Sequence, residues 1–208
     1  MKNDREYRSM TMSIEERDDD KKIVTGYATT FDDPYLLWTD DDVEVWEVVD
    51  RNAFANTDMD DVIMQYDHQG RVFARKRNNT LEINPDDKGL FIRADLGGTD
   101  IGRELYQEIE GGYTDRMSFG FTVKDQRRDI EERENGKTKV TRFVLSVGKL
   151  FDVSAVSLPA NPNTSIISAR FLDGVIEEVR AERLKAQELK EERDRLMKRA
   201  KALGGTNK

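Results

Sequence analysis

The chain contains one histidine, His68, and no cysteine, and this composition restricts the covalent chemistry available to it. Without cysteine there is no thiolate nucleophile, no disulfide and no cysteine-ligated zinc. One imidazole cannot form a multi-histidine metal site, but it can act as a general base beside an oxygen nucleophile. A lone histidine is often structural or incidental. If His68 acts as a general base, it requires a hydroxyl nucleophile within hydrogen-bonding distance.

A serine suited to this role is Ser118, in the segment DRMSFGFTV. Alternate residues of a β-strand point to opposite faces. The apolar face here is formed by Met117, Phe119, Phe121 and Val123, and the other face by Ser118, Gly120 and Thr122. The second face either meets solvent or presents Ser118 to a substrate, with Gly120 leaving room for the substrate backbone.

The surroundings of His68 and Asp152 fit the same chemistry. In IMQYDHQGR, Met64 and Tyr66 alternate towards one side and His68 ends the series before Gly70, which predicts an imidazole at a strand end near a turn. Asp152 lies between apolar residues in KLFDVSAVSLPANP, where a carboxylate is costly unless it is paired. It is either an exposed residue at a strand start or the acid that orients His68.

Two other acids compete with Asp152. Asp67 adjoins His68 and Asp115 lies close to Ser118 in the sequence, so strand alternation would point each away from its neighbour. The residues near Ser118 do not define an oxyanion hole; backbone N–H groups and the Arg116 side chain are the alternatives.

Short β-prone runs separated by turn residues dominate the chain as far as Leu158. They cover residues 22–31, 43–49, 61–68, 79–83, 89–96, 118–123, 137–150 and 152–158. The segments NPDDKG and ENGK are typical of hairpin turns, because Gly and Asn accept positive φ. This spacing predicts a mainly β fold with helices, arranged as a closed or partly closed barrel or a sandwich.

Two helices and a helical turn are also expected. Thr99 or Asp100 can cap a helix within residues 98–112, and a turn of helix is expected at residues 50–57. Pro159 and Pro162 stop the last strand, and residues from Arg170 to about Leu203 read as one long charged helix. We therefore expect a polar N-terminal segment (1–21), a central domain (22–170) and a charged C-terminal helix with a frayed end (171–208).

The composition excludes several classes of function. The net charge of −8 argues against a general DNA-binding surface, which requires basic residues. No run has the length and apolar character of a signal peptide or a membrane span, so a cytoplasm-like compartment is expected. The Asp triplets at 18–20 and 40–42 lack the spacing and glycine of a calcium loop, so we expect no metal and no cofactor.

Several segments, in their order along the chain, resemble one family. YDHQGRVFARKRNNTLEINPDDKGLFIRADL, GGYTDRMSFGFTV and LFDVSAVSLPANPNTSIISAR are similar to the prohead maturation proteases of tailed phages, relatives of the herpesvirus assemblins. GYATTF and VVDRNAF resemble that family's opening strands and short helix. The resemblance covers roughly Ile23 to Arg170.

The resemblance implies that His68 is the base, Ser118 the nucleophile and Asp152 the third member of a serine protease triad. Two features depart from the relatives: the assemblins use a second histidine as third member, and many phage members have Glu where Asp152 stands. The implied barrel would be of the herpesvirus-protease type, with an inserted helix and the long C-terminal helix.

The implied function is cleavage of scaffold or capsid-protein segments, and of the protease itself, inside the assembling procapsid in the host cytoplasm. The expected partners are these substrates and further copies of the chain, with no membrane and no specific nucleic acid. The alternative is a non-catalytic capsid assembly or scaffold factor with the same fold.

Overall fold

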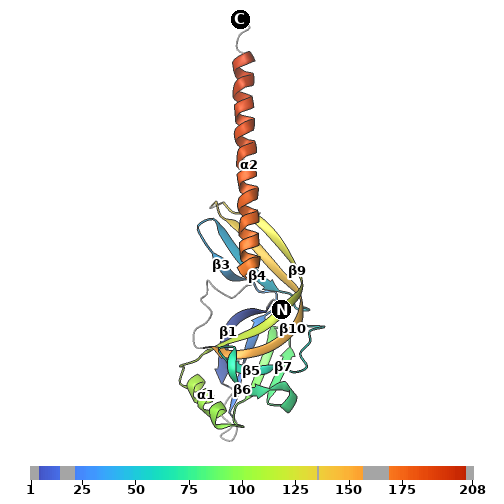
Figure 1. The fold of residues 1–208 in the computed structure, drawn as a ribbon, viewed down its shortest axis with the longest axis vertical. Coiled ribbons are helices and arrows are strands. Elements are labelled where there is room, and N and C mark those ends of the chain that lie inside the picture. Colours follow the sequence, from blue (N-terminus) through green and yellow to red (C-terminus); the bar gives the residue numbers. More distant parts are fainter. Residues whose placement is uncertain (1–4, 15–21, 135, 157–168, 205–208) are drawn as a thin grey trace. The chain divides into compact units, whose positions relative to one another are not determined.

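The computed structural model describes residues 5–14, 22–134, 136–156 and 169–204 (Figure 1). It divides into two compact units, Met1–Ser168 and Ala169–Lys208, and each is described by itself. The described part of the first is a β body with one α-helix and the short 3-10 helix η1 (Lys76–Asn78), and the second contains the helix α2 (Ala169–Gly204). None of the described helices is long and apolar enough to cross a membrane.

Ten strands form the sheet of the body. They are β1 (Glu6–Ile14), β2 (Ile23–Thr30), β3 (Tyr35–Thr39), β4 (Val43–Val49), β5 (Ile63–Tyr66), β6 (Gln69–Arg75), β7 (Leu81–Pro85), β8 (Gly89–Asp95), β9 (Arg116–Glu132) and β10 (Thr138–Val156). The main path runs β3-β4-β10-β9-β1-β2-β8-β7, with β5 pairing β10 and β6. The predicted mainly β fold with helices is confirmed, but this path is open, so a barrel is not confirmed.

The long hairpin of β9 and β10 organises the body (Figure 1). β9 and β10 pair antiparallel, from Thr138 opposite Glu132 to Val156 opposite Arg116. β10 also pairs in parallel with β4 near its start and with β5 near its end. Segments that are distant in the sequence therefore converge on the end of β10.

The core lies on one face of this curved sheet. Its buried residues include Met64, Leu90, Ile92, Leu105, Met117, Phe119, Phe121, Val144, Leu150 and Val153. The rings of Phe119 and Phe121 stack with centroids 4.7 Å apart. The apolar face that the sequence predicts for residues 117–121 is thus confirmed as core.

A buried cluster of charges lies among β1, β4 and β10. Arg8 donates from Nε to Glu47 Oε1 at 2.6 Å, and Arg142 donates from Nη2 to Glu6 Oε1 at 2.8 Å. Arg142 also reaches Glu47, and Tyr35 donates to the same glutamate. Two arginines and two glutamates are therefore paired inside the body, which compensates much of the cost of burying each charge.

α1 (Asp100–Glu110) forms as the sequence predicts. Thr99 is its N-cap, and its side chain accepts a hydrogen bond from the Gly102 N–H at 3.1 Å. Leu105, Tyr106 and Ile109 are buried on one face and belong to the core.

Several expectations require correction. Residues 51–56 form successive turns where a helical turn was expected over 50–57, and Thr138–Val156 form one strand, β10, where two strands were expected. Within the N-terminal segment 1–21, Glu6–Ile14 form β1, and β3 and β6 were not expected. The prolines at 159 and 162 lie outside the described residues.

Candidate active site

Ser118 lies on β9 in the middle of the sheet. It is opposite Ser154 of β10 on one side and Ser9 of β1 on the other. Its neighbours Met117 and Phe119 point into the core, so Ser118 occupies the other face of the sheet. This second face does not leave Ser118 in solvent, since the residue is only 3% exposed.

His68 lies in the tight turn between β5 and β6. Tyr66 pairs with Gln69 across this turn, and the intervening Asp67 and His68 have φ of 47° and 58°. Two successive positive φ values are the signature of the type I′ hairpin turn. The left-handed region costs non-glycine residues energy, and such strain concentrates at functional sites. The Asp67 N–H donates to the Ala155 carbonyl at 2.9 Å, which ties the turn to β10.

The position of His68 near a turn at the strand end is confirmed, but its expected alignment with Met64 and Tyr66 is wrong. Laterally paired residues of a sheet lie on the same face. Met64 pairs with the core residue Val153, so the Met64 side chain lies on the core face of the sheet. Ile63 pairs with Asp152, so these two residues lie on the opposite face. The turn instead carries the imidazole to the opposite face, where Asp152 lies.

Ser118, His68 and Asp152 meet on this face. His68 Nε2 is 2.7 Å from Ser118 Oγ, and His68 Nδ1 contacts Asp152 Oδ2. The His68 side chain is 18% exposed, whereas Asp152 is 1% exposed. An imidazole held between a hydroxyl and a buried carboxylate is arranged to accept the hydroxyl proton and to be stabilised when charged.

Asp152 has further contacts that the sequence analysis missed. The Ser154 hydroxyl, which is fully buried, donates to Asp152 Oδ2 at 3.0 Å. Arg5 Nη1 lies 3.5 Å from Asp152 Oδ1, and its guanidinium stacks over the Phe151 ring at 3.9 Å. Strand alternation places Ser154 on the face of Asp152 and was a usable signal; no pattern in the sequence points to Arg5.

The other residues considered for the site have different surroundings. Asp115 forms an ion pair with Arg116, with Oδ1 and Nε 3.5 Å apart, and both side chains are more than two-fifths exposed. Asp67 lines a pocket on the hairpin that carries His68. No group of three or more His, Asp or Glu residues suited to a metal ion occurs in the described part of the chain.

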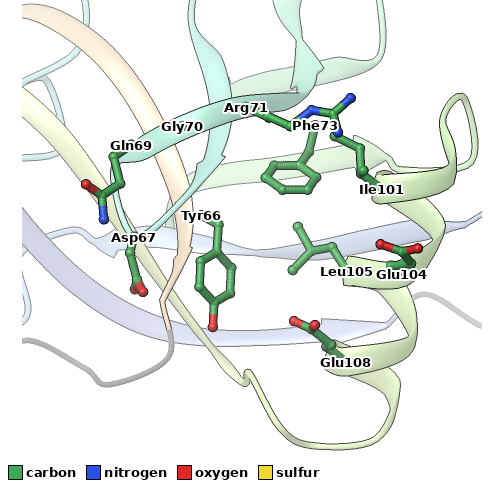
Figure 2. Close-up of a pocket in the computed structure, with 10 residues that line it drawn as sticks. All are labelled: Tyr66, Asp67, Gln69, Gly70, Arg71, Phe73, Ile101, Glu104, Leu105 and Glu108. Atoms are coloured by element: carbon green, nitrogen blue, oxygen red, sulfur yellow. The ribbon is translucent and has the colours of Figure 1, made fainter.

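This pocket, of about 510 Å³, lies between the β5–β6 hairpin and α1 (Figure 2). Tyr66 and Phe73 face Leu105 across it, and Ile101 adds to its apolar wall. Charged and polar side chains complete the lining, namely Asp67, Gln69, Arg71, Glu104 and Glu108. Asp67 and Gln69 flank His68 in the chain, but His68, Ser118 and Asp152 are not among the residues that line the pocket.

Comparison with models of protein families gives a match over most of the chain. The model of a family described as caudovirus prohead serine protease matches residues 9–177, which include His68, Ser118 and Asp152. No curated protein and no solved structure matches the chain.

Proposed function

Because this chain belongs to the caudovirus prohead serine protease family, we propose that it is an endopeptidase with Ser118 as nucleophile. Its substrates are scaffold or capsid-protein segments and the protease itself, cleaved during capsid maturation. The observation that supports this assignment is the 2.7 Å contact between His68 Nε2 and Ser118 Oγ, with Asp152 at the other ring nitrogen.

In the proposed mechanism, His68 takes the Ser118 proton as Oγ attacks the peptide carbonyl carbon. The tetrahedral intermediate collapses when His68 gives that proton to the leaving nitrogen, which breaks the C–N bond and leaves an acyl-enzyme. Water, deprotonated by His68, then hydrolyses the ester and regenerates Ser118. Asp152 holds the ring and stabilises its charged form.

The oxyanion and the substrate chain need their own binding groups. Backbone N–H groups near Ser118 or the Arg116 side chain would stabilise the oxyanion. We propose that the pocket lined by Asp67 and Gln69, the chain neighbours of His68, receives a side chain of the substrate. We propose that this work takes place inside the assembling procapsid in the host cytoplasm, by a homo-oligomer, without a membrane, specific nucleic acid or cofactor.

A fluorophosphonate probe tests the nucleophile without knowledge of the cleavage site. Wild-type protein should be labelled at Ser118, and Ser118→Ala and His68→Ala should each lose both labelling and capsid-protein processing while remaining folded. Ser146→Ala, which changes a β10 serine outside the site, is the matched control. Normal processing by Ser118→Ala or His68→Ala would overturn the assignment.

The alternative, a non-catalytic assembly factor, makes a different prediction. Such a protein would promote procapsid assembly with no change in the mass of any component, and Ser118→Ala would behave as wild type. Intact masses of the protease and of co-expressed capsid and scaffold proteins distinguish the two.

A further inference from the structure

Helix α2 carries a row of exposed apolar side chains. Leu189 is 67% exposed, Leu196 59% and Met197 58%. At about 1.5 Å rise per residue, a helix of 36 residues is roughly 54 Å long. Exposed leucines along so long a helix identify a face that a partner would cover.

The face has the spacing of a coiled-coil seam. Ala186 and Arg193 are seven residues apart and occupy a positions of a heptad. The d positions, which also repeat every seven residues, are Glu182, Leu189 and Leu196. All five are exposed. Val179, the preceding a position, is already buried within the chain, so the exposed seam begins at Glu182.

Two charged residues in this seam determine whether two α2 helices can pair in parallel or antiparallel orientation. Neither Glu182 nor Arg193 forms an ion pair with another described residue. In a parallel pair of α2 helices, each charge would face its own copy, Glu182 against Glu182 and Arg193 against Arg193. Like charges at a and d positions oppose association.

An antiparallel pair reverses this relationship. When Ala186 lies level with Leu189 of a second copy, Glu182 lies level with Arg193 of that copy, and symmetry repeats both layers. The only charged residues of the exposed seam thus meet as opposite charges, and each leucine at 189 meets an alanine.

The flanking positions set the strength of the pairing. On one flank, Lys185 approaches Glu192 of the second copy, and Glu178 approaches Arg199. On the other flank, Arg183 approaches Lys190 of the second copy, and these two positive charges repel each other. Together with the two alanines in the seam, this repulsion predicts a weak, concentration-dependent dimer.

We propose that α2 associates with α2 of a second copy of this chain as an antiparallel two-stranded coiled coil, registered by Glu182 and Arg193. The interaction is independent of peptide hydrolysis, so it can be measured on the full chain carrying Ser118→Ala, in which self-cleavage is absent.

Charge exchange tests the register by sedimentation equilibrium. Glu182→Arg and Arg193→Glu should each weaken self-association roughly tenfold or more, because like charges then face each other in two layers. A mixture of the two variants, or the double variant, should recover wild-type association. Glu191→Arg reverses a charge on the opposite side of the helix and should change little. A monomeric wild type, or double exchange without recovery, would overturn the proposal.

The absence of native cysteine allows a direct test of direction. Glu182→Cys and Arg193→Cys chains, mixed under mild oxidation, should give the mixed disulfide dimer, because the partner layer keeps its own Arg–Glu pair. Each variant alone should remain uncross-linked, since identical positions lie about 16 Å apart along the axis. If each variant cross-links to itself and the mixture contains no disulfide between Cys at 182 and Cys at 193, the pair is parallel and the proposal is refuted.

Discussion

Ser154 donates its hydroxyl hydrogen to the same Asp152 oxygen that contacts His68. The donor is fully buried, and it lies two residues after its acceptor on the same face of β10. The Arg5 guanidinium adds a positive charge 3.5 Å from the other carboxylate oxygen. Asp152 is therefore held from three sides, and its charge is shared between the imidazole and two other groups.

Removing these supports should slow catalysis. Ser154→Ala and Arg5→Gln each remove a group that contacts the Asp152 carboxylate, so the carboxylate is held less firmly against His68. We expect kcat/KM to fall in both variants, by up to roughly 10²-fold, measured with a peptide taken from a mapped cleavage site.

Arg51→Gln serves as the control, because Arg51 is exposed and pairs with Asp32 on the surface. Its kcat/KM should match wild type. Wild-type kcat/KM in Ser154→Ala or Arg5→Gln would show that the residue does not position Asp152.

The acid of the triad can be tested by neutral substitution. Asp152→Asn should fold normally but reduce kcat roughly 10²- to 10⁴-fold, because the amide no longer stabilises the charged ring. Asp67→Asn and Asp115→Asn are matched controls that should retain most activity. If Asp152→Asn cleaves at the wild-type rate while one of the controls fails, the orienting acid has been misassigned.

The pocket between α1 and the His68 hairpin should affect substrate use. Ile101→Trp places a larger side chain on the pocket wall. We expect about a tenfold lower kcat/KM on a peptide substrate, with fluorophosphonate labelling of Ser118 unchanged. Val72→Trp enlarges a residue of β6 that does not line the pocket and is 39% exposed. Equal effects of the two substitutions would count against a role of this pocket in binding.

The buried charge cluster should be sensitive to the loss of one member. Glu47→Gln keeps the shape of a fully buried side chain but removes a negative charge that both Arg8 and Arg142 contact. Removing one partner of a buried ion pair costs about 3–5 kcal/mol of unfolding free energy. Urea unfolding of the Ser118→Ala chain should show this loss, whereas Asp129→Asn at an exposed pair should show none.

The same cluster predicts a loss of stability in acid. Burial opposes ionisation of Glu6, but hydrogen bonds and charges from Arg142 and Arg8 prevail and lower the pKa of its carboxyl. A lowered folded-state pKa contributes stability above the unfolded pKa, and the contribution is lost as pH falls through the folded pKa. Unfolding free energy should therefore fall below about pH 4.5, and less steeply in Glu6→Gln. Identical slopes in both proteins would contradict this assignment.

Strands with apolar alternation were predicted closely. β4 was expected at its observed bounds, Val43–Val49, because its side chains alternate clearly. β10 was read as two strands because the shifts in its pairing with β9, between Val144 and Asp152, interrupt the regular alternation.

The sequence did not reveal β1 because its buried face is partly charged. Glu6 and Arg8 take positions that a hydrophobic pattern would fill with apolar side chains. Their partners Glu47 and Arg142 are distant in the chain, so only the assembled sheet shows why these charges are buried. Arg5, beside Asp152, was missed for the same reason. Asp152 and His68 could be proposed from their residue types and surroundings, together with the resemblance to the phage proteases.

The pairing of β1 with β9 also affects the order in which the chain can fold. Ser9 and Ser118 lie side by side, although they are far apart in the sequence. β1 and the His68 hairpin leave the ribosome well before β9 and β10, and pairings of high sequence separation form slowly. A chain that ends before β9 lacks the proposed nucleophile, its acid and the two strands that carry them. The proposed catalytic centre is therefore among the last parts to assemble, and under the proposed function an incompletely synthesised chain could not cleave capsid proteins made alongside it.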